Sequence, residues 1–180
     1  MNIYGGKELG RQFRTVRQNT IQIAEDIPEE HYNHVPAPDC RSVAQMLTHI
    51  AIAPLMWQEI HGKQRLMTLV GFDFPALAER VKGEESKSRT KAEILELLRN
   101  HGEKFAAWLE TLPPEMLEEM ITVADGSGTK SRFEQLLGAK EHEMHHRAQL
   151  MLIERQLGIV PHLTRQFQER MAQARSARAN

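Results

Sequence analysis

The chain has 180 residues, of which 41% are hydrophobic and 26% are charged, and its formal net charge at pH 7 is −1. This length and composition are typical of one soluble domain spanning residues 1–180, with enough apolar side chains for a core of its own. Because the charges nearly balance, no general affinity for nucleic acid or for a membrane surface is expected.

The cysteine content and the apolar runs of the sequence indicate the compartment in which the protein is expected. Cys40 is the single cysteine, so the chain cannot form an internal disulfide, which is consistent with a reducing compartment. The first residues do not read as a signal peptide, and the longest apolar run, 50–57, is too short to cross a bilayer. We therefore expect a cytoplasmic protein.

The first predicted helix is marked by one mostly apolar stripe. Its side chains recur at alternating steps of four and three residues, the spacing of a single buried helix face. They are Leu9, Phe13, Val16, Thr20, Ala24 and Ile27. Pro28 closes the helix, because a proline cannot continue the backbone hydrogen-bond ladder.

Three further helices are predicted from capping boxes, in which a serine or threonine and a residue three positions later cap each other's backbone N–H. The boxes are Ser42 with Gln45, Thr90 with Glu93, and Ser131 with Glu134. The second helix is predicted to run to His61, with a kink near Ile50 because Pro54 removes the donor for that carbonyl. The fourth helix is predicted to end at Gly158.

Long connections separate these four helices. Residues 62–89 are predicted to hold a short helix around 76–81, and residues 112–130 are compatible with a short strand pair around 120–124. The tail from Thr164 is compatible with a fifth helix. Since long alternating runs of β-branched residues are scarce, the sequence predicts an all-α four-helix bundle.

The 62–89 connection is richer in apolar side chains than one loop needs. They are Leu66, Met67, Leu69, Val70, Phe72 and Phe74. Two interpretations stay open: the connection folds over the bundle as a lid, or it contributes with the second and third helices to a two-fold homodimer.

A histidine-rich segment lies within the fourth predicted helix. Residues 141–147 read Glu-His-Glu-Met-His-His-Arg, in which His142, Glu143 and His146 match H-E-x-x-H. At a rise of about 1.5 Å per residue, His142 and His146 lie roughly 6 Å apart along one helix face, so both can reach one metal ion. No third ligand follows closely, so the other ligands must come from elsewhere in the chain.

His49, in the second predicted helix, is the preferred third ligand. Its neighbours one turn away are apolar, and an imidazole in such surroundings needs a partner. Three inward-facing neutral imidazoles on two helices are difficult to satisfy without a cation. The sequence therefore predicts a metal site on His49, His142 and His146.

The other histidines are less favoured as ligands. His145 has a suitable spacing from His142 but lies on a more polar face, and adjacent helical residues such as His145 and His146 point about 100° apart. His101 falls on an apolar stripe and is either a hydrogen-bonded core residue or a neighbour of the site. The remaining four lie in predicted loops or at helix ends, where we expect exposure: His31, His34, His61 and His162.

Together these segments resemble the DinB/YfiT-like family of metal-binding bundles. The matching pieces are the first helix, the run from Ser42 to Ile50, the run from His142 to Leu150, and the ending Leu157-Gly158-Ile159-Val160-Pro161. The resemblance implies a four-helix bundle, a dimer, and a metal triad on His49, His142 and His146. One departure is Ala148, which stands where the family often has glycine.

Three protein nitrogens with an open position are typical of a catalytic metal site. We therefore expect zinc or nickel to activate a water or a thiol toward a small-molecule substrate. The resemblance adds thiol S-transferases and isomerases that use a low-molecular-weight thiol, and other members named only for induction by DNA damage. A thiol-dependent S-transferase or a hydrolase is the leading hypothesis.

Three points stay open. Glu143 is a candidate general base, but it points about 100° away from His142 and is also interpretable as a solvated neighbour. A zincin-type metalloprotease would carry H-E-x-x-H, yet the chain offers neither a clear substrate-binding strand edge nor a clear downstream ligand, Glu169 being a late candidate. The third hypothesis is non-enzymatic: a metal-stabilised dimer or stress-response protein that binds a partner, which loss of metal would unfold.

Overall fold

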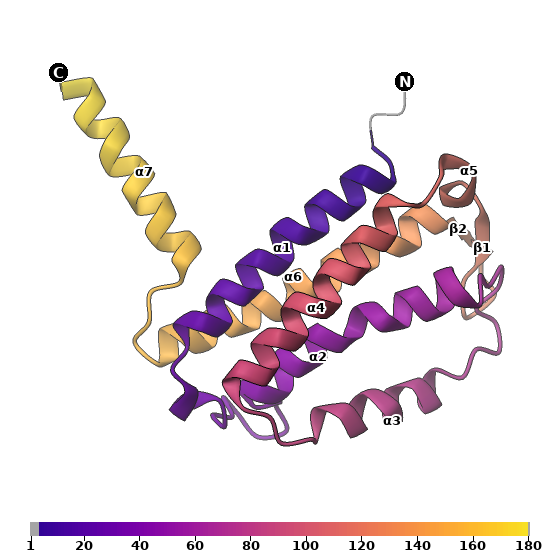
Figure 1. The fold of residues 1–180 in the computed structure, drawn as a ribbon, viewed down its shortest axis with the longest axis horizontal. Coiled ribbons are helices and arrows are strands. Elements are labelled where there is room, and N and C mark those ends of the chain that lie inside the picture. The colour runs from indigo at the N-terminus through magenta and orange to yellow at the C-terminus, as the bar shows by residue number, and fades with distance from the viewer. Residues whose placement is uncertain (1–3, 180) are drawn as a thin grey trace.

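The computed structural model describes residues 4–179 and is built on four long helices. These are α1 (Gly6–Asp26), α2 (Val43–Trp57), α4 (Lys91–Glu110) and α6 (Arg132–Gln156). In Figure 1, α1 and α6 run in one direction and α2 and α4 in the other. The order of contact around the bundle is α1–α4–α2–α6, so the successive helices α1 and α2 lie diagonally opposite each other. The predicted all-α four-helix bundle is confirmed.

The three predicted capping boxes begin three of these helices. Ser42 Oγ accepts a hydrogen bond from the Gln45 backbone N–H at 3.2 Å, and Gln45 Oε1 accepts one from the Ser42 backbone N–H at 2.9 Å. The other boxes form in the same way: Thr90 with Glu93 and Ser131 with Glu134. Beyond α6, Gly158 has a φ of 78°, a left-handed conformation that glycine adopts without strain and that stops the helix.

Pro54 is accommodated inside α2. The carbonyl of Ile50 has no helical donor opposite the proline, and Arg17 Nη2, from α1, donates to it at 3.0 Å. The backbone stays α-helical to Trp57 and continues as a π-helical segment, η2 (Gln58–Lys63). The irregular segment therefore lies about two to four turns beyond Ile50, where a kink was predicted. The helical path also extends beyond the predicted end at His61.

The connection between α2 and α4 contains a longer helix than predicted. This helix, α3 (Phe74–Glu85), begins at Asp73, whose side chain accepts a hydrogen bond from the Ala76 backbone N–H at 2.8 Å. It packs along α2, outside the four-helix bundle (Figure 1). A short 3₁₀ turn, η1 (Glu29–His31), lies between α1 and α2.

The remaining elements flank α6. The short helix α5 (Pro114–Leu117) precedes an antiparallel hairpin of β1 (Met120–Thr122) and β2 (Thr129–Ser131), in which Ile121 pairs with Lys130. After α6 the chain forms α7 (His162–Ala179), the fifth long helix, which projects away from the bundle in Figure 1. Within residues 4–179, none of the helices combines the length and apolar character that crossing a bilayer requires.

The core has two main apolar clusters. One includes Ile23, Leu47, Leu98 and Leu150, and the other includes Phe13, Phe105, Leu109 and Leu136. The apolar residues of the 62–89 connection are divided in their burial. Leu69 is buried with Ile60 and Ile121, whereas Met67 and Val70 remain 50% and 53% exposed. The connection therefore covers the bundle only in part.

Candidate metal centre

The three histidines predicted as ligands meet between α2 and α6. The Nε2 atoms of His49 and His142 lie 2.9 Å apart, and the three ring centroids are 4.5 to 4.8 Å from one another. One ligand nitrogen of each ring lies within 4.8 Å of the other two, so the group could hold a metal ion. Helices α2 and α6 are antiparallel neighbours (Figure 1), and the middle of α2, which carries His49, lies against the middle of α6, which carries His142 and His146.

Glu85, the last residue of α3, supports His49 from behind. Its Oε1 lies 2.7 Å from His49 Nδ1, and its Oε2 accepts a hydrogen bond from Arg41 Nε at 2.7 Å. A carboxylate that accepts the Nδ1 proton holds the imidazole in the tautomer whose Nε2 lone pair is free. Because Nε2 is the atom that faces His142, Glu85 leaves the free lone pair of His49 directed at the histidine cluster.

Sequence reasoning missed Glu85. The residue lies 36 positions from His49, in a connection for which only a short helix around 76–81 was predicted. The distance between the two side chains depends on the packing of α3 against α2. No local spacing rule could have found this partner.

His146 and His142 are held by neighbours of a different kind. His146 Nδ1 lies 2.8 Å from the side-chain oxygen of Gln149, one turn along α6. With that oxygen accepting a proton from Nδ1, the Nε2 lone pair of His146 is free for a cation. The ring of His142 lies beside the indole of Trp57, with centroids 5.6 Å apart. Two of the three imidazoles therefore have a polar partner on the nitrogen away from the cluster.

Burial keeps the three imidazoles neutral. Burial, together with the neighbouring His49 and His146, lowers the pKa of His142 to about 3. Burial also lowers the pKa of His49, with Arg41 acting in the same direction and Glu85 opposing both. The pKa of His146 is lowered mainly by burial as well. Neutral imidazole is the form that binds a metal, so the folded chain keeps these three side chains in the protonation state that a metal site requires.

Two other histidines discussed as rivals lie outside the cluster. His145 is exposed on the outer face of α6. His101 is half-buried on α4, and its Nδ1 lies 3.1 Å from the Ala51 carbonyl oxygen, as expected for a hydrogen-bonded core residue. Ala148 is exposed, so its methyl group does not crowd the packing of α6 against its neighbours.

Glu143 is not a solvated neighbour of the histidines. Its side chain is buried, and its two oxygens accept hydrogen bonds from Arg17 Nε and Nη2, both at 2.9 Å. Arg17 also donates to the carbonyls of Leu98 and Ile50, so one guanidinium ties α1 to the other three bundle helices. With both oxygens held by Arg17, the geometry favours a structural role for Glu143 over that of a general base.

The expectation of exposure was wrong for two histidines at helix ends. His61 is 2% exposed, and its Nδ1 accepts a hydrogen bond from the buried Arg132 at 3.1 Å. Burial and the nearby guanidinium lower the pKa of His61 to about 4. His162 is 3% exposed, with Nε2 lying 3.2 Å from Asn19 Oδ1. Tertiary packing buries both residues, although their sequence positions indicate helix ends.

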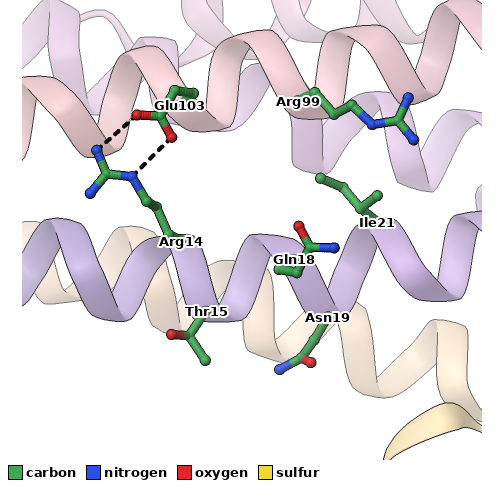
Figure 2. Close-up of a pocket in the computed structure, with 7 residues that line it drawn as sticks. All are labelled: Arg14, Thr15, Gln18, Asn19, Ile21, Arg99 and Glu103. Atoms are coloured by element: carbon green, nitrogen blue, oxygen red, sulfur yellow. Dashed lines mark hydrogen bonds and ion pairs between the residues drawn. The ribbon is translucent and has the colours of Figure 1, made fainter.

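A groove on the opposite side of the bundle does not resemble an active site. It lies between α1 and α4, has a volume of about 550 Å³, and is lined mostly by polar residues (Figure 2). Figure 2 shows the ion pair between Arg14 and Glu103, in which Arg14 Nη2 lies 2.8 Å from Glu103 Oε1. Arg14 is also paired with Glu110. Within this groove, the charge of Arg14 is therefore neutralised by neighbouring carboxylates.

The fold and the site together define a class of protein: a four-helix bundle with three clustered histidines contributed by two antiparallel helices. The model of the DinB family matches residues 1–176 of the chain. The protein therefore belongs to the DinB family.

Among its relatives is the uncharacterized protein YjoA of Bacillus subtilis (strain 168). The two are 25% identical over 152 residues, which is 84% of this chain and 90% of YjoA. The crystal structure of YjoA, a DinB-like protein, covers 84% of this chain and 92% of its own, with a TM-score of 0.62 and 22% identity. These values indicate a shared fold along nearly the whole chain.

A second solved structure of similar fold is YfiT from Bacillus subtilis. It is 17% identical, covers 86% of this chain and 88% of its own, and has a TM-score of 0.66. YfiT is described as a probable metal-dependent hydrolase with an unusual four-helix bundle topology. At this identity the likeness shows the fold alone.

Proposed function

We propose that this protein binds one divalent metal ion, zinc or nickel, through His49, His142 and His146, and uses it as an enzyme acting on a small molecule. The observation that carries the proposal is the convergence of three imidazoles on one point, with Glu85 orienting His49. The metal-dependent activity described for YfiT supports the same conclusion.

The donor set fits a divalent cation. Two nitrogens bound tetrahedrally to zinc at about 2.0–2.1 Å lie roughly 3.3 Å apart. His49 Nε2 and His142 Nε2 are 2.9 Å apart, so a small outward movement of either ring would admit the ion. Two neutral imidazole nitrogens that face each other can share only one proton, and a cation satisfies both lone pairs as well as that of His146.

Three nitrogen ligands leave room for a further ligand, as in catalytic metal sites. A divalent cation held there would supply Lewis acidity, lowering the pKa of a water or thiol toward neutrality. Glu85 keeps the His49 Nδ1 proton in place, and Gln149 does the same for His146, so neither of these two rings has to change its tautomer when the metal binds. We propose a hydrolase, with a low-molecular-weight thiol as the alternative nucleophile in an S-transferase.

Metal binding to single variants tests the ligand set. His49→Ala, His142→Ala and His146→Ala should each lose stoichiometric zinc and nickel in calorimetric titrations, because the two remaining imidazoles bind far more weakly. The matched control is His145→Ala, which removes an exposed histidine from the same helix. Full metal occupancy in His49→Ala would eliminate a site shared between α2 and α6.

The metal-loaded chain distinguishes the two nucleophiles. Ester and amide substrates with water alone test the hydrolase, and electrophiles with added low-molecular-weight thiols test the S-transferase. Turnover should require the metal and should be lost in His142→Ala. A metal-loaded chain inactive in both assays, but unfolded by metal removal, would instead favour the non-enzymatic, metal-stabilised alternative.

A zincin-type protease is not proposed. In that mechanism the glutamate of H-E-x-x-H acts as the general base beside the metal. Here Glu143 is buried against Arg17, and each of its oxygens accepts a hydrogen bond from that guanidinium.

A further inference from the structure

A cavity lies between α2, α3 and α4, and the three clustered histidines are not among its lining residues. Its volume is about 660 Å³, within the range of about 300–1,000 Å³ that is usual for small-molecule sites. Its apolar wall is made by Ile52, Leu55, Met56, Leu77, Val81 and Leu97. We refer to it below as the α3 cavity.

The rim of the α3 cavity carries more positive than negative charge. Its cations are Lys63, Arg80, Lys87 and Arg89, and its carboxylates are Glu59 and Glu84. Lys63 lies 3.0 Å from Glu59, and Arg89 lies 2.8 Å from Glu84, which also pairs with Lys87. Arg80 belongs to none of the ion pairs formed among residues 4–179. The rim therefore has a surplus of two cations over carboxylates, and Arg80 is available to a ligand.

His101 adds one oriented hydrogen-bonding group to the wall. Its Nδ1 lies 3.1 Å from the carbonyl oxygen of Ala51, which can only accept, so Nδ1 carries the proton. Nε2 is then the acceptor nitrogen. Burial lowers the pKa of His101, so the ring is neutral at pH 7 and keeps this lone pair. A ligand with a hydroxyl or N–H donor could be recognised at this point.

We infer that the α3 cavity binds an amphipathic organic anion, with its apolar body against Leu55, Leu77 and Leu97 and its acidic group at Arg80. The concave shape and the volume suit a small molecule better than a protein surface. This site is distinct from the metal centre and does not depend on it. The two share α3, in which Glu84 borders the cavity and the next residue, Glu85, holds His49.

The test uses two probes that differ mainly in charge. The anion 1-anilinonaphthalene-8-sulfonate and the neutral N-phenyl-1-naphthylamine share one aromatic body, and each is titrated into the full chain by fluorescence. The anion should bind saturably at one site. Leu55→Glu, a change of a 44% exposed residue, should weaken its binding about tenfold or more, because a carboxylate enters the apolar wall.

Arg80→Gln separates charge recognition from apolar contact. It should weaken binding of the anion by about three- to fivefold, the size expected for loss of one exposed ion pair. The affinity for the neutral probe should stay unchanged. The matched controls are Leu152→Glu, at a 60% exposed position on α6, and Arg170→Gln, on α7. Both should bind the anion as the unaltered chain does.

Several results would overturn the inference. The first is non-saturable binding of the anion. The second is an equal affinity for the anion in Leu55→Glu and Leu152→Glu. The third is an equal loss of affinity for the anion and for the neutral probe in Arg80→Gln. His142→Ala, which removes a proposed metal ligand, should bind the anion normally. Loss of binding in that variant would place the probe at the histidines and refute a separate site.

Discussion

The role of Glu85 can be tested by replacing its carboxylate with an amide. Glu85→Gln keeps the shape of the side chain and an oxygen that can accept the His49 Nδ1 proton, but it removes the negative charge. The neighbouring Glu84 pairs with Lys87 and Arg89 rather than with a histidine, so Glu84→Gln is a matched control on the same turn.

The expected magnitude follows from the burial and contacts of Glu85. Its side chain is only 8% exposed, and the 2.7 Å contact with His49 Nδ1 is short, as in charge-assisted hydrogen bonds. Loss of such a partner to a metal-binding histidine typically costs about 10–100-fold in metal affinity, which corresponds to about 1.4–2.8 kcal/mol. The loss of zinc affinity should be near the lower limit, about tenfold, in Glu85→Gln, and near the upper limit, about 100-fold, in Glu85→Ala.

The assay is a competition titration of zinc against a chelator of known affinity at pH 7.5, with thermal unfolding of the metal-free variants as a check on folding. Glu85→Gln and Glu84→Gln with equal zinc affinities would refute the reasoning. The same conclusion would follow if Glu85→Ala bound zinc as tightly as the unaltered chain.

Three further predictions concern stability and assembly. Glu143→Gln leaves Arg17 charged and buried without its counter-ion, so the free energy of unfolding measured in urea should fall by about 3–5 kcal/mol. The double variant Arg17→Met with Glu143→Leu should lose much less stability, and a similar loss in both variants would contradict this account. Because burial lowers the pKa of His142 to about 3 in the folded chain while an unfolded imidazole titrates near 6.5, the unfolded state takes up the proton first, and stability should decrease as pH falls from about 6.5 toward the folded value. Urea unfolding at pH 7.5, 6.5 and 5.5 measures this decrease, which His142→Gln should reduce; an unchanged slope would count against it. The homodimer proposed from the exposed apolar residues of the 62–89 connection predicts a sedimenting mass near twice the 20.7 kDa chain, and Val70→Glu should dissociate it, whereas a monomer at micromolar concentration rules it out.

Local sequence signals were sufficient for the helices and for part of the site. Capping boxes at Ser42, Thr90 and Ser131 begin α2, α4 and α6 because the groups that form them lie within one turn of backbone. The pairing of His142 with His146 follows from helical spacing alone, and their ring centroids are indeed 4.5 Å apart. His49 could be preferred because an imidazole among apolar neighbours needs a partner.

What the sequence alone determined is therefore whatever depends on residues within one or two helical turns: the capped starts of α2, α4 and α6, the buried face of α1 and the histidine pair. Only the tertiary structure decided that α1 and α2 lie diagonally, that Glu85 supports His49, and that Glu143 pairs with Arg17 across 126 residues. The physical reason is that these contacts depend on how whole helices pack against one another. A charged residue on a helix face has the same local sequence signal whether its neighbour in space is water or a buried guanidinium.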